Sequence, residues 1–206
     1  MSSNAVVHLI DDDEGVRRAL AFLLGTAGLA VRVYESASAF LDQDRDSLAG
    51  CVVSDVRMPG IDGLELLRRL KASGVTLPVI IMTGHADVPL AVEAMKTGAV
   101  DFIEKPFPDD VLLGAIKVAF ARSGKIGQGS AEIEQVRGRL QSLTPRENEV
   151  LKGLLRGYPN KTIAYDLGLS PRTVEVHRAN VMTKMGASSL PELVRMTLMV
   201  GDFSPG

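Results

Sequence analysis

The first part of the chain alternates short apolar runs with segments in which apolar residues recur at helical spacing. The runs that predict strands are Val6–Ile10, Val31–Tyr34, Cys51–Ser54, Val79–Met82 and Val100–Ile103. The clearest helical faces are formed by Leu64, Leu67 and Leu70, and by Val88, Ala91, Val92 and Met95. Glycines at positions 28, 74 and 98 stand where helices of this length would end. This alternation predicts a five-stranded parallel sheet with helices on both faces.

The pattern changes after residue 123, where three glycines fall within residues 123–130 and predict a flexible joint. Only helical patterns follow. Thr144 and Glu147 flank Pro145 in the arrangement of a capping box, and Asn160 and Ser170 are placed to open further helices. A fourth helix is predicted over Leu190–Val200. We therefore expect an α/β domain over residues 1–123, a linker over 124–141 and an all-α, four-helix domain over 142–206.

Composition narrows the class of protein only slightly. The 206 residues carry a net charge of −2, but residues 1–123 hold 12 basic and 17 acidic side chains, and residues 140–206 hold 8 basic and 6 acidic. This asymmetry is a weak indication of nucleic-acid binding by the second half. The single cysteine, Cys51, excludes an internal disulfide and a CxxC metal or redox site. No apolar stretch approaches the roughly 20 residues that span a bilayer, so we expect a soluble, cytoplasmic protein without a membrane partner.

Four chemically distinctive residues each lie at or just past the end of a predicted strand: Asp11, Asp55, Thr83 and Lys105. The carboxyl ends of parallel strands share one edge of a sheet, where binding sites form. A carboxylate at the end of a buried strand is costly to ionise because burial removes its water, so it is usually paired, metal-bound or reactive. Because Asp12 adjoins Asp11, we expect three or more carboxylates to converge there.

Clustered carboxylates suit a hard divalent ion such as Mg²⁺, which relieves their mutual repulsion. Asp55 could then attack a phosphoryl donor and become an aspartyl phosphate. Lys105 would pair with the phosphoryl group and the Thr83 hydroxyl would donate to one of its oxygens. Taken singly, each of these residues is better explained without a function, as a helix cap or a loop lysine. Their common position at strand ends favours the functional interpretation.

This region resembles the receiver domain of two-component response regulators, which has a flavodoxin-like fold. The residues that carry the resemblance are Asp11-Asp12, Asp55-x-x-Met58-Pro59-Gly60 with Gly63, Thr83-Gly84 and Lys105-Pro106. The resemblance implies that Asp55 accepts a phosphoryl group from a sensor histidine kinase. It also implies that Asp12, Asp55 and the carbonyl of Arg57 hold Mg²⁺, with Asp11 acting through water. Phe102 matches the aromatic residue that turns inward when Thr83 engages the phosphate.

The segment from Asn160 to Lys184 predicts two helices joined by a tight turn. In the second helix, Val174, His177, Val181 and Met185 form one stripe, whereas the opposite face is mainly polar. This pattern suits insertion into the major groove, and it suits a helical bundle for protein docking nearly as well.

Residues 142–200 resemble the LuxR-type helix-turn-helix domain, which favours DNA. The matching residues are Leu143-Thr144-x-Arg146-Glu147, Asn160-Lys161-x-Ile163-Ala164, Thr173-Val174-x-x-His177 and Asn180-Val181-x-x-Lys184-Met185. The resemblance implies that Ser170–Lys184 is the recognition helix. Candidates for contacts with base edges are Glu175, Val176 and Ala179; candidates for phosphate contacts are Lys161, Arg172, Thr173, Arg178 and Lys184.

The sequence thus predicts a phosphorylation-switched transcriptional activator rather than an enzyme. The expected partners are a sensor histidine kinase, a double-stranded DNA operator, RNA polymerase and, after phosphorylation, a second copy of the chain. One alternative is a metal-dependent phosphatase with an aspartyl nucleophile, although such enzymes typically carry a second Asp where Arg57 stands. The other is a receiver whose helical tail binds protein or RNA.

Overall fold

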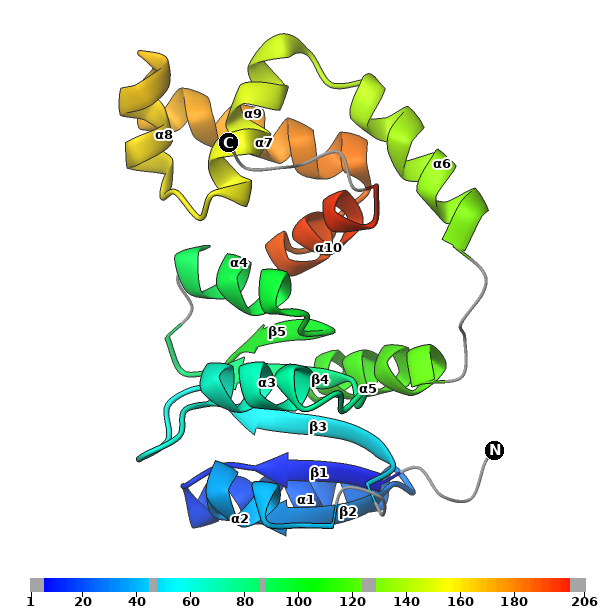
Figure 1. Cartoon of the computed structure of the whole chain (residues 1–206). Helices are drawn as coiled ribbons and strands as arrows, with labels where there is room; N and C mark the ends of the chain where they lie inside the picture. The colour runs from blue at the N-terminus through cyan, green and yellow to red at the C-terminus, as the bar shows by residue number, and fades with distance from the viewer. Residues whose placement is uncertain (1–5, 45–47, 86–87, 124–128, 201–206) are drawn as a thin grey trace. The chain divides into compact units, whose positions relative to one another are not determined.

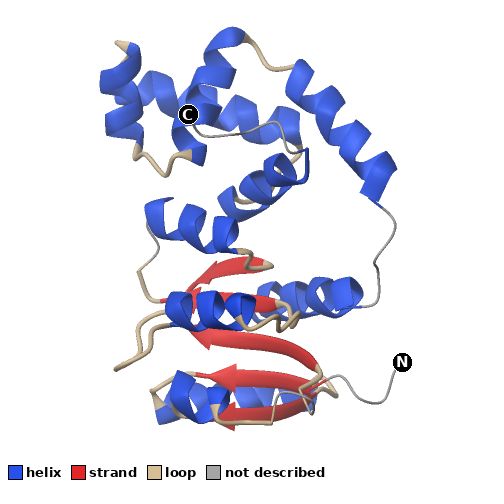
Figure 2. Ribbon diagram, viewed as in Figure 1, coloured by secondary structure: helices blue, strands red, loops and turns tan. Residues whose placement is uncertain are grey.

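The computed structural model describes residues 6–44, 48–85, 88–123 and 129–200. Most of the predicted glycine-rich joint lies outside these ranges. The chain divides into two compact units, Met1–His85 with Thr97–Ile126 and Ala86–Lys96 with Gly127–Gly206. Figures 1 and 2 show a sheet with helices in the first unit and helices alone in the second. Within the described ranges, no helix is long and apolar enough to cross a membrane.

The five predicted strands are confirmed, and each boundary lies within one residue of its predicted position. They are β1 (Val6–Ile10), β2 (Ala30–Tyr34), β3 (Gly50–Asp55), β4 (Val79–Thr83) and β5 (Asp101–Glu104). All neighbours are parallel, and the strand order is β2-β1-β3-β4-β5 (Figure 1). The chain reverses its direction of travel across the sheet after β2, because β3 lies on the other side of β1. Such a switch point is where open parallel sheets place their sites.

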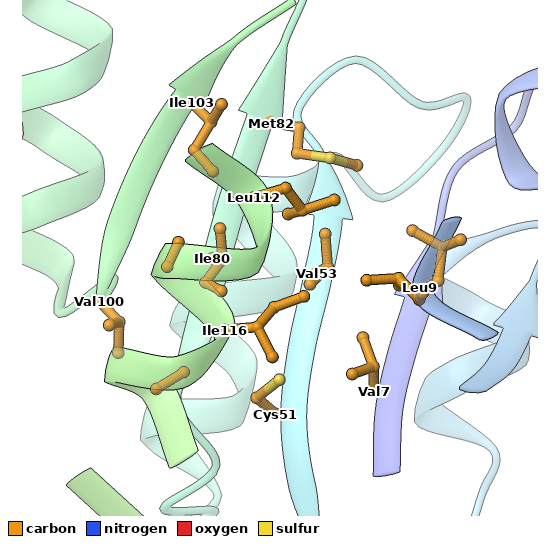
Figure 3. Close-up of a cluster of buried hydrophobic side chains, with 13 residues drawn as sticks. Val7, Leu9, Cys51, Val53, Ile80, Met82, Val100, Ile103, Leu112 and Ile116 are labelled. Atoms are coloured by element: carbon orange, nitrogen blue, oxygen red, sulfur yellow. The ribbon is translucent and has the colours of Figure 1, made fainter. Parts of the chain in front are cut away.

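The helices of the first unit cover both faces of this sheet. They are α1 (Glu14–Thr26), α2 (Ala37–Leu41), α3 (Gly63–Ala72) and α5 (Asp109–Ser123). Alternate strand residues such as Val7, Val53 and Ile80 form one apolar cluster with Leu112 and Ile116 of α5 (Figure 3). The other face of β1 carries His8, whose ring packs edge-on against Phe40 of α2. The period-two alternation of the strands thus divides the core into two layers.

The helix α4 (Val88–Thr97) follows β4 in the chain and is grouped with the second unit. Its predicted apolar face is confirmed, because Ala91, Val92 and Met95 are buried. The glycines at positions 28, 74 and 98 adopt positive φ, as the helix-ending role requires.

The second unit also contains α6 (Gly129–Gln141), α7 (Pro145–Leu155), α8 (Asn160–Leu167), α9 (Pro171–Met185) and α10 (Leu190–Val200). The capping box of Thr144 and Glu147 and the Ser170 cap of α9 are confirmed. The cap of α8 differs from the prediction: Pro159 occupies the N-cap position and Asn160 is already helical. Helix α6 occupies residues 129–141 of the range that we expected to be a linker.

Candidate functional site

Three charged residues meet at the carboxyl edge of the sheet. The Lys105 Nζ donates to Asp11 Oδ2 at 2.6 Å and to Asp55 Oδ1 at 2.7 Å. Neither carboxylate is open to solvent, since Asp11 is 1% and Asp55 7% exposed. Because β1 and β5 each lie within two strands of β3, residues 94 positions apart in the sequence share one ion-paired site. The predicted convergence of strand-end residues therefore holds for these three.

The backbone around Asp55 fixes the orientation of its carboxylate. The Arg57 N–H donates to Asp55 Oδ2 at 2.6 Å, so both carboxylate oxygens are engaged. The chain then returns, and the Gly63 N–H donates to the Val56 carbonyl at 2.9 Å. A Cβ at Gly63 would lie 2.2 Å from the carbonyl oxygen of Asp55, closer than real Cβ contacts allow. Position 63 must therefore be glycine if the loop is to pass beside the strand end.

Burial and charge act in opposite directions on the acid–base properties of the site. Burial raises the pKa of Asp55, and the neighbouring Asp11 charge acts in the same direction, whereas Lys105 and the Arg57 N–H oppose the shift. Burial by itself lowers the pKa of Lys105, but hydrogen bonds to the two carboxylates outweigh it and the pKa is raised. Lys105 is thus held as a cation between two desolvated acids.

Asp12 does not join this group. Asp12 is exposed, and it lies between Asp11, which is buried, and Asp13, which is exposed too. Asp13 caps α1 by accepting from the Val16 N–H at 3.0 Å, and its own N–H donates to Asp11 Oδ1 at 3.0 Å. In the part of the chain that the structure describes, no three acidic, histidine or cysteine side chains are arranged to hold a metal ion. We expected three carboxylates to converge, but only two of the three, Asp11 and Asp55, meet at this edge, and Lys105 bridges them.

Thr83 and Phe102 lie in the two neighbouring strands, β4 and β5. The Thr83 side chain is fully buried, and its hydroxyl donates to the His85 carbonyl at 3.2 Å and accepts from the His85 N–H at 3.3 Å. Phe102 is 8% exposed, so its ring is inside the protein. The hydroxyl is occupied by its own loop, through neutral and rather long hydrogen bonds that a charged acceptor could replace.

Sequence reasoning missed one side chain at this edge. Arg17 Nη1, from the second turn of α1, donates to the carbonyl oxygen of Asp11 at 2.7 Å. Arg17 is half-buried, whereas its neighbour Arg18 is exposed and pairs with Glu14 on the same helix. A basic residue near a helix N-terminus opposes the helix dipole, which hints at a specific partner. That signal was present in the sequence but is too weak to identify the carbonyl.

The helix α9 of the second unit has the two faces that the sequence predicts. Val174, Val181 and Met185 are buried, and His177 is half-buried. On the opposite face, the exposed candidates for nucleic-acid contact are Arg172, Glu175, Val176 and Ala179; Lys161 of α8 is exposed too. Thr173 and Arg178 are half-buried: the Thr173 hydroxyl bonds Ser170 at 2.8 Å and Arg178 Nη1 donates to Asn160 Oδ1 at 3.5 Å.

Lys184 has a partner that the sequence did not reveal. Its Nζ lies 2.7 Å from Glu147 Oε2 of α7, and Glu147 is 3% exposed. The same carboxylate oxygen accepts from the Thr144 N–H at 2.8 Å. The pKa of Glu147 is lowered to about 2, mainly by the hydrogen bond from Lys184 and next by the Thr144 N–H. The ion pair joins the start of α7 to the end of α9.

Two protein families match the two parts of the chain. Residues 7–117 match the family described as the response regulator receiver domain, and residues 141–197 match the bacterial regulatory proteins of the luxR family. The parallel sheet with an acidic site at its carboxyl edge, followed by the helical unit, defines the class. The chain belongs to the two-component response regulators with a LuxR-type DNA-binding domain.

Within that class the chain is similar to FixJ. It is 57% identical to the transcriptional regulatory protein FixJ of Azorhizobium caulinodans, covering 98% of this chain and 95% of that protein. Identity to FixJ of Bradyrhizobium diazoefficiens is 52%, with 98% of each chain covered. Among solved structures, full-length FixJ from B. japonicum is 51% identical, with a TM-score of 0.57 and coverage of 98% and 100%. The response regulator StyR is 40% identical, with a TM-score of 0.57 and coverage of 95% and 99%.

Proposed function

We propose that Asp55 accepts a phosphoryl group from a histidine kinase, and that the phosphorylated chain dimerises on a DNA operator and activates transcription. The observation that carries this proposal is the pairing of Lys105 with both Asp11 and Asp55 at the carboxyl edge of the sheet. A buried nucleophile with an adjacent cation suits phosphoryl uptake, because charge develops on the transferred group.

In the transfer, this chain supplies the nucleophile and the kinase supplies the phosphorylated imidazole. An oxygen of the Asp55 carboxylate attacks phosphorus while the bond from phosphorus to the donor imidazole breaks, and the imidazole leaves with the electron pair. The Lys105 ammonium then exchanges a carboxylate oxygen for a phosphoryl oxygen, still within reach of the same edge. The Arg57 N–H holds the other oxygen of Asp55 and limits rotation of the nucleophile. No proton has to be removed from Asp55, because the ionised form is the nucleophile.

Mg²⁺ fits the donors at this edge. Hard cations prefer oxygen ligands, and the buried pair Asp11 and Asp55 already holds one cation, the Lys105 ammonium. Asp12, Asp55 and the carbonyl of Arg57 would hold the ion, with Asp11 acting through water; Asp12 has to turn inward to take part. Bound there, the ion supplies positive charge that offsets the charge of the transferred phosphoryl group.

Thr83 would pass the signal on. Phosphorylation adds about −1.5 to −2 charge at Asp55, and the Thr83 hydroxyl exchanges its neutral bond to His85 for a charge-assisted one. Shifting a two-state equilibrium from 1:99 to 99:1 requires roughly 5.5 kcal/mol of differential affinity, to which Thr83 and Lys105 both contribute. The Phe102 ring already lies inside the protein, so it adjusts to Thr83 without entering from solvent. The surface around residues 87–122, of which residue 87 lies outside the described ranges, then changes shape and dimerises.

On the duplex, α9 would lie in the major groove. Glu175, Val176 and Ala179 face base edges, and the flanking cations Lys161, Arg172 and Arg178, with the Thr173 hydroxyl, face phosphates. We assign Lys184 to the ion pair with Glu147 instead of a phosphate contact, because its ammonium is already engaged. A dimer presents two such helices to two half-sites.

The similarity to FixJ supports a cellular role. We propose that the kinase is FixL-like, that the operator lies at nitrogen-fixation or microaerobic genes, and that RNA polymerase is the final partner, in the cytoplasm. The chain acts as a phosphoacceptor with at most slow self-dephosphorylation.

The proposal is tested by binding of DNA with and without phosphorylation. Wild type and Asp55→Asn are incubated with acetyl phosphate and Mg²⁺, and duplexes are then selected from a random pool. We expect selection by wild type only, with affinity that falls as salt rises because counterions are released. Retention of protein or RNA but no duplex would favour the docking alternative. Steady turnover of a phosphomonoester would favour the phosphatase. Arg172→Ala should weaken all duplexes about equally, as expected of a phosphate contact.

A further inference from the structure

Helix α6 is packed against the recognition helix although it lies where the sequence predicts a linker. Val136 is 3% exposed, and Ile133 and Leu140 are half-buried at helical spacing from it. The face that these residues form packs against the second unit, because α6 contacts both α9 and α10. Residues 129–141 therefore belong to the folded helical unit.

One polar contact joins α6 to the end of α9. Arg139 Nη1 donates to the carbonyl oxygen of Met185, the last residue of α9, at 2.7 Å. Backbone N–H groups beyond the helix satisfy the carbonyls of Met182 and Thr183. Carbonyls of a last turn have no partner within the helix, and the helix dipole makes this end negative. The Arg139 guanidinium gives the Met185 carbonyl a hydrogen-bond donor and places a positive charge at the negative end of the helix.

The residue after α9 is a glycine, which leaves room for the Arg139 side chain. Gly186 has φ 64°, a left-handed conformation that favours glycine, and a Cβ there would lie 2.8 Å from Arg139 Nη1. The other cation of this turn, Lys184, is engaged with Glu147 of α7. Two cations thus tie the end of α9 to two different helices, α6 and α7.

We propose that Arg139 is a positioning residue for DNA recognition, and that α6 is part of the DNA-binding unit. The inference rests on the proposed function, in which α9 reads a duplex. An α-helix of 15 residues is about 22 Å long, so a small tilt at its anchored end moves the residues that face bases at the other end. Arg139 acts through α9 and contacts no base itself.

Arg137 provides a matched control within the full chain. It lies two residues from Arg139 on the same helix, but its side chain is 47% exposed and forms an ion pair with Glu134 of α6 itself. Arg139→Ala, Arg139→Lys and Arg137→Ala are each phosphorylated with acetyl phosphate and Mg²⁺. Binding is then measured for the duplex that wild type selects and for a scrambled duplex, over a range of salt concentrations.

We expect Arg139→Ala to bind the selected duplex roughly tenfold more weakly. Scrambled-duplex affinity, the salt dependence and phosphoryl uptake should not change, Arg139→Lys should recover part of the loss, and Arg137→Ala should match wild type. Wild-type affinity in Arg139→Ala overturns the inference. So does equal weakening on both duplexes with a salt slope smaller by about 0.9, because that result is typical of a phosphate contact.

Hydrogen exchange tests the same contact without DNA. Amides at residues 185–188 should exchange faster in Arg139→Ala than in Arg137→Ala, and equal rates would overturn the inference. If Arg139→Ala loses helical circular dichroism, Arg139→Gln, which keeps a donor but no charge, is measured in its place by the same criteria. Failure of wild type to select any duplex would refute the proposed function, whereas the exchange result still decides whether Arg139 anchors α9.

Discussion

Lys184→Met should destabilise the helical unit by removing the cation that faces buried Glu147. The Glu147 pKa is lowered from its ordinary value of 4.5 to about 2, with the Lys184 hydrogen bond as the largest cause and the Thr144 N–H next. A shift of that size corresponds to at most about 3 kcal/mol. Lys184 supplies only part of it, and its side chain is 36% exposed. After allowance for solvent screening, we expect Lys184→Met to lower the free energy of unfolding by ~1–2 kcal/mol at pH 7.

The dependence on pH identifies the cause. Because the folded-state pKa of Glu147 lies below its unfolded value, its stabilisation is fully present above pH 4.5 and is lost as the pH falls towards 2. Below pH 4.5 the Glu147 carboxylate protonates, and it does so first in the variant, which lacks the Lys184 cation. The difference in unfolding free energy between wild type and Lys184→Met should therefore become smaller below that pH. A matched control is Arg146→Met, which removes an exposed ion pair with Glu149 on α7 and should change stability by under about 1 kcal/mol.

Urea unfolding read by pulsed hydrogen–deuterium labelling measures this free energy for peptides of α7 and α9 separately from those of the sheet. Stabilisation by the Lys184–Glu147 pair is refuted if Lys184→Met and Arg146→Met unfold at the same urea concentration at pH 7. It is also refuted if the difference between their unfolding free energies is the same at pH 7 and pH 3. A Lys184→Met protein that keeps its stability but shows a smaller salt slope on duplex DNA would restore Lys184 as a phosphate contact.

Two further substitutions probe the sheet edge, each with a control in the same unit. Gly63→Ala places a Cβ against the Asp55 carbonyl and should lower the free energy of unfolding in urea by about 1–3 kcal/mol. The control Gly25→Ala, with open space around its Cβ, should leave the stability unchanged or raise it. Equal effects of the two substitutions would contradict the close approach at Gly63. Arg17→Ala should raise the Mg²⁺ concentration needed for half-maximal phosphorylation severalfold, because the end of β1 loses its support, whereas Arg18→Ala should not; the same Mg²⁺ requirement in both variants would remove Arg17 from the site.

The local pattern of the sequence predicts most of the fold and the centre of the site. The alternation of apolar runs and helical faces gives the strands, and strand-end positions are enough to bring Asp11, Asp55 and Lys105 together, because parallel topology puts all such ends at one edge. The exposure of Asp12 was not predictable, since neighbouring residues at a strand end can face either inward or outward.

The contacts that the sequence missed join elements that are distant in the chain. Arg139 and Met185, and Glu147 with Lys184, are 46 and 37 residues apart. The local sequence predicts a capping role for Glu147 and a phosphate contact for Lys184, and it predicts no role for Arg139. Only the packing of the helices brings these residues to their partners. The glycines at positions 124, 127 and 129 led us to expect a linker over residues 124–141, and helix α6 occupies residues 129–141 of that range.

Phosphoryl incorporation at Asp55 is the most direct test of the account. Wild type and Asp55→Asn are incubated with acetyl phosphate in the presence of Mg²⁺ or excess chelator, and intact-mass and peptide mass spectrometry locate the modification. The account predicts one added phosphoryl group, on the peptide that contains Asp55, only in the wild type and only with Mg²⁺. Equal incorporation in Asp55→Asn, or a label at another residue of the wild type, would contradict it.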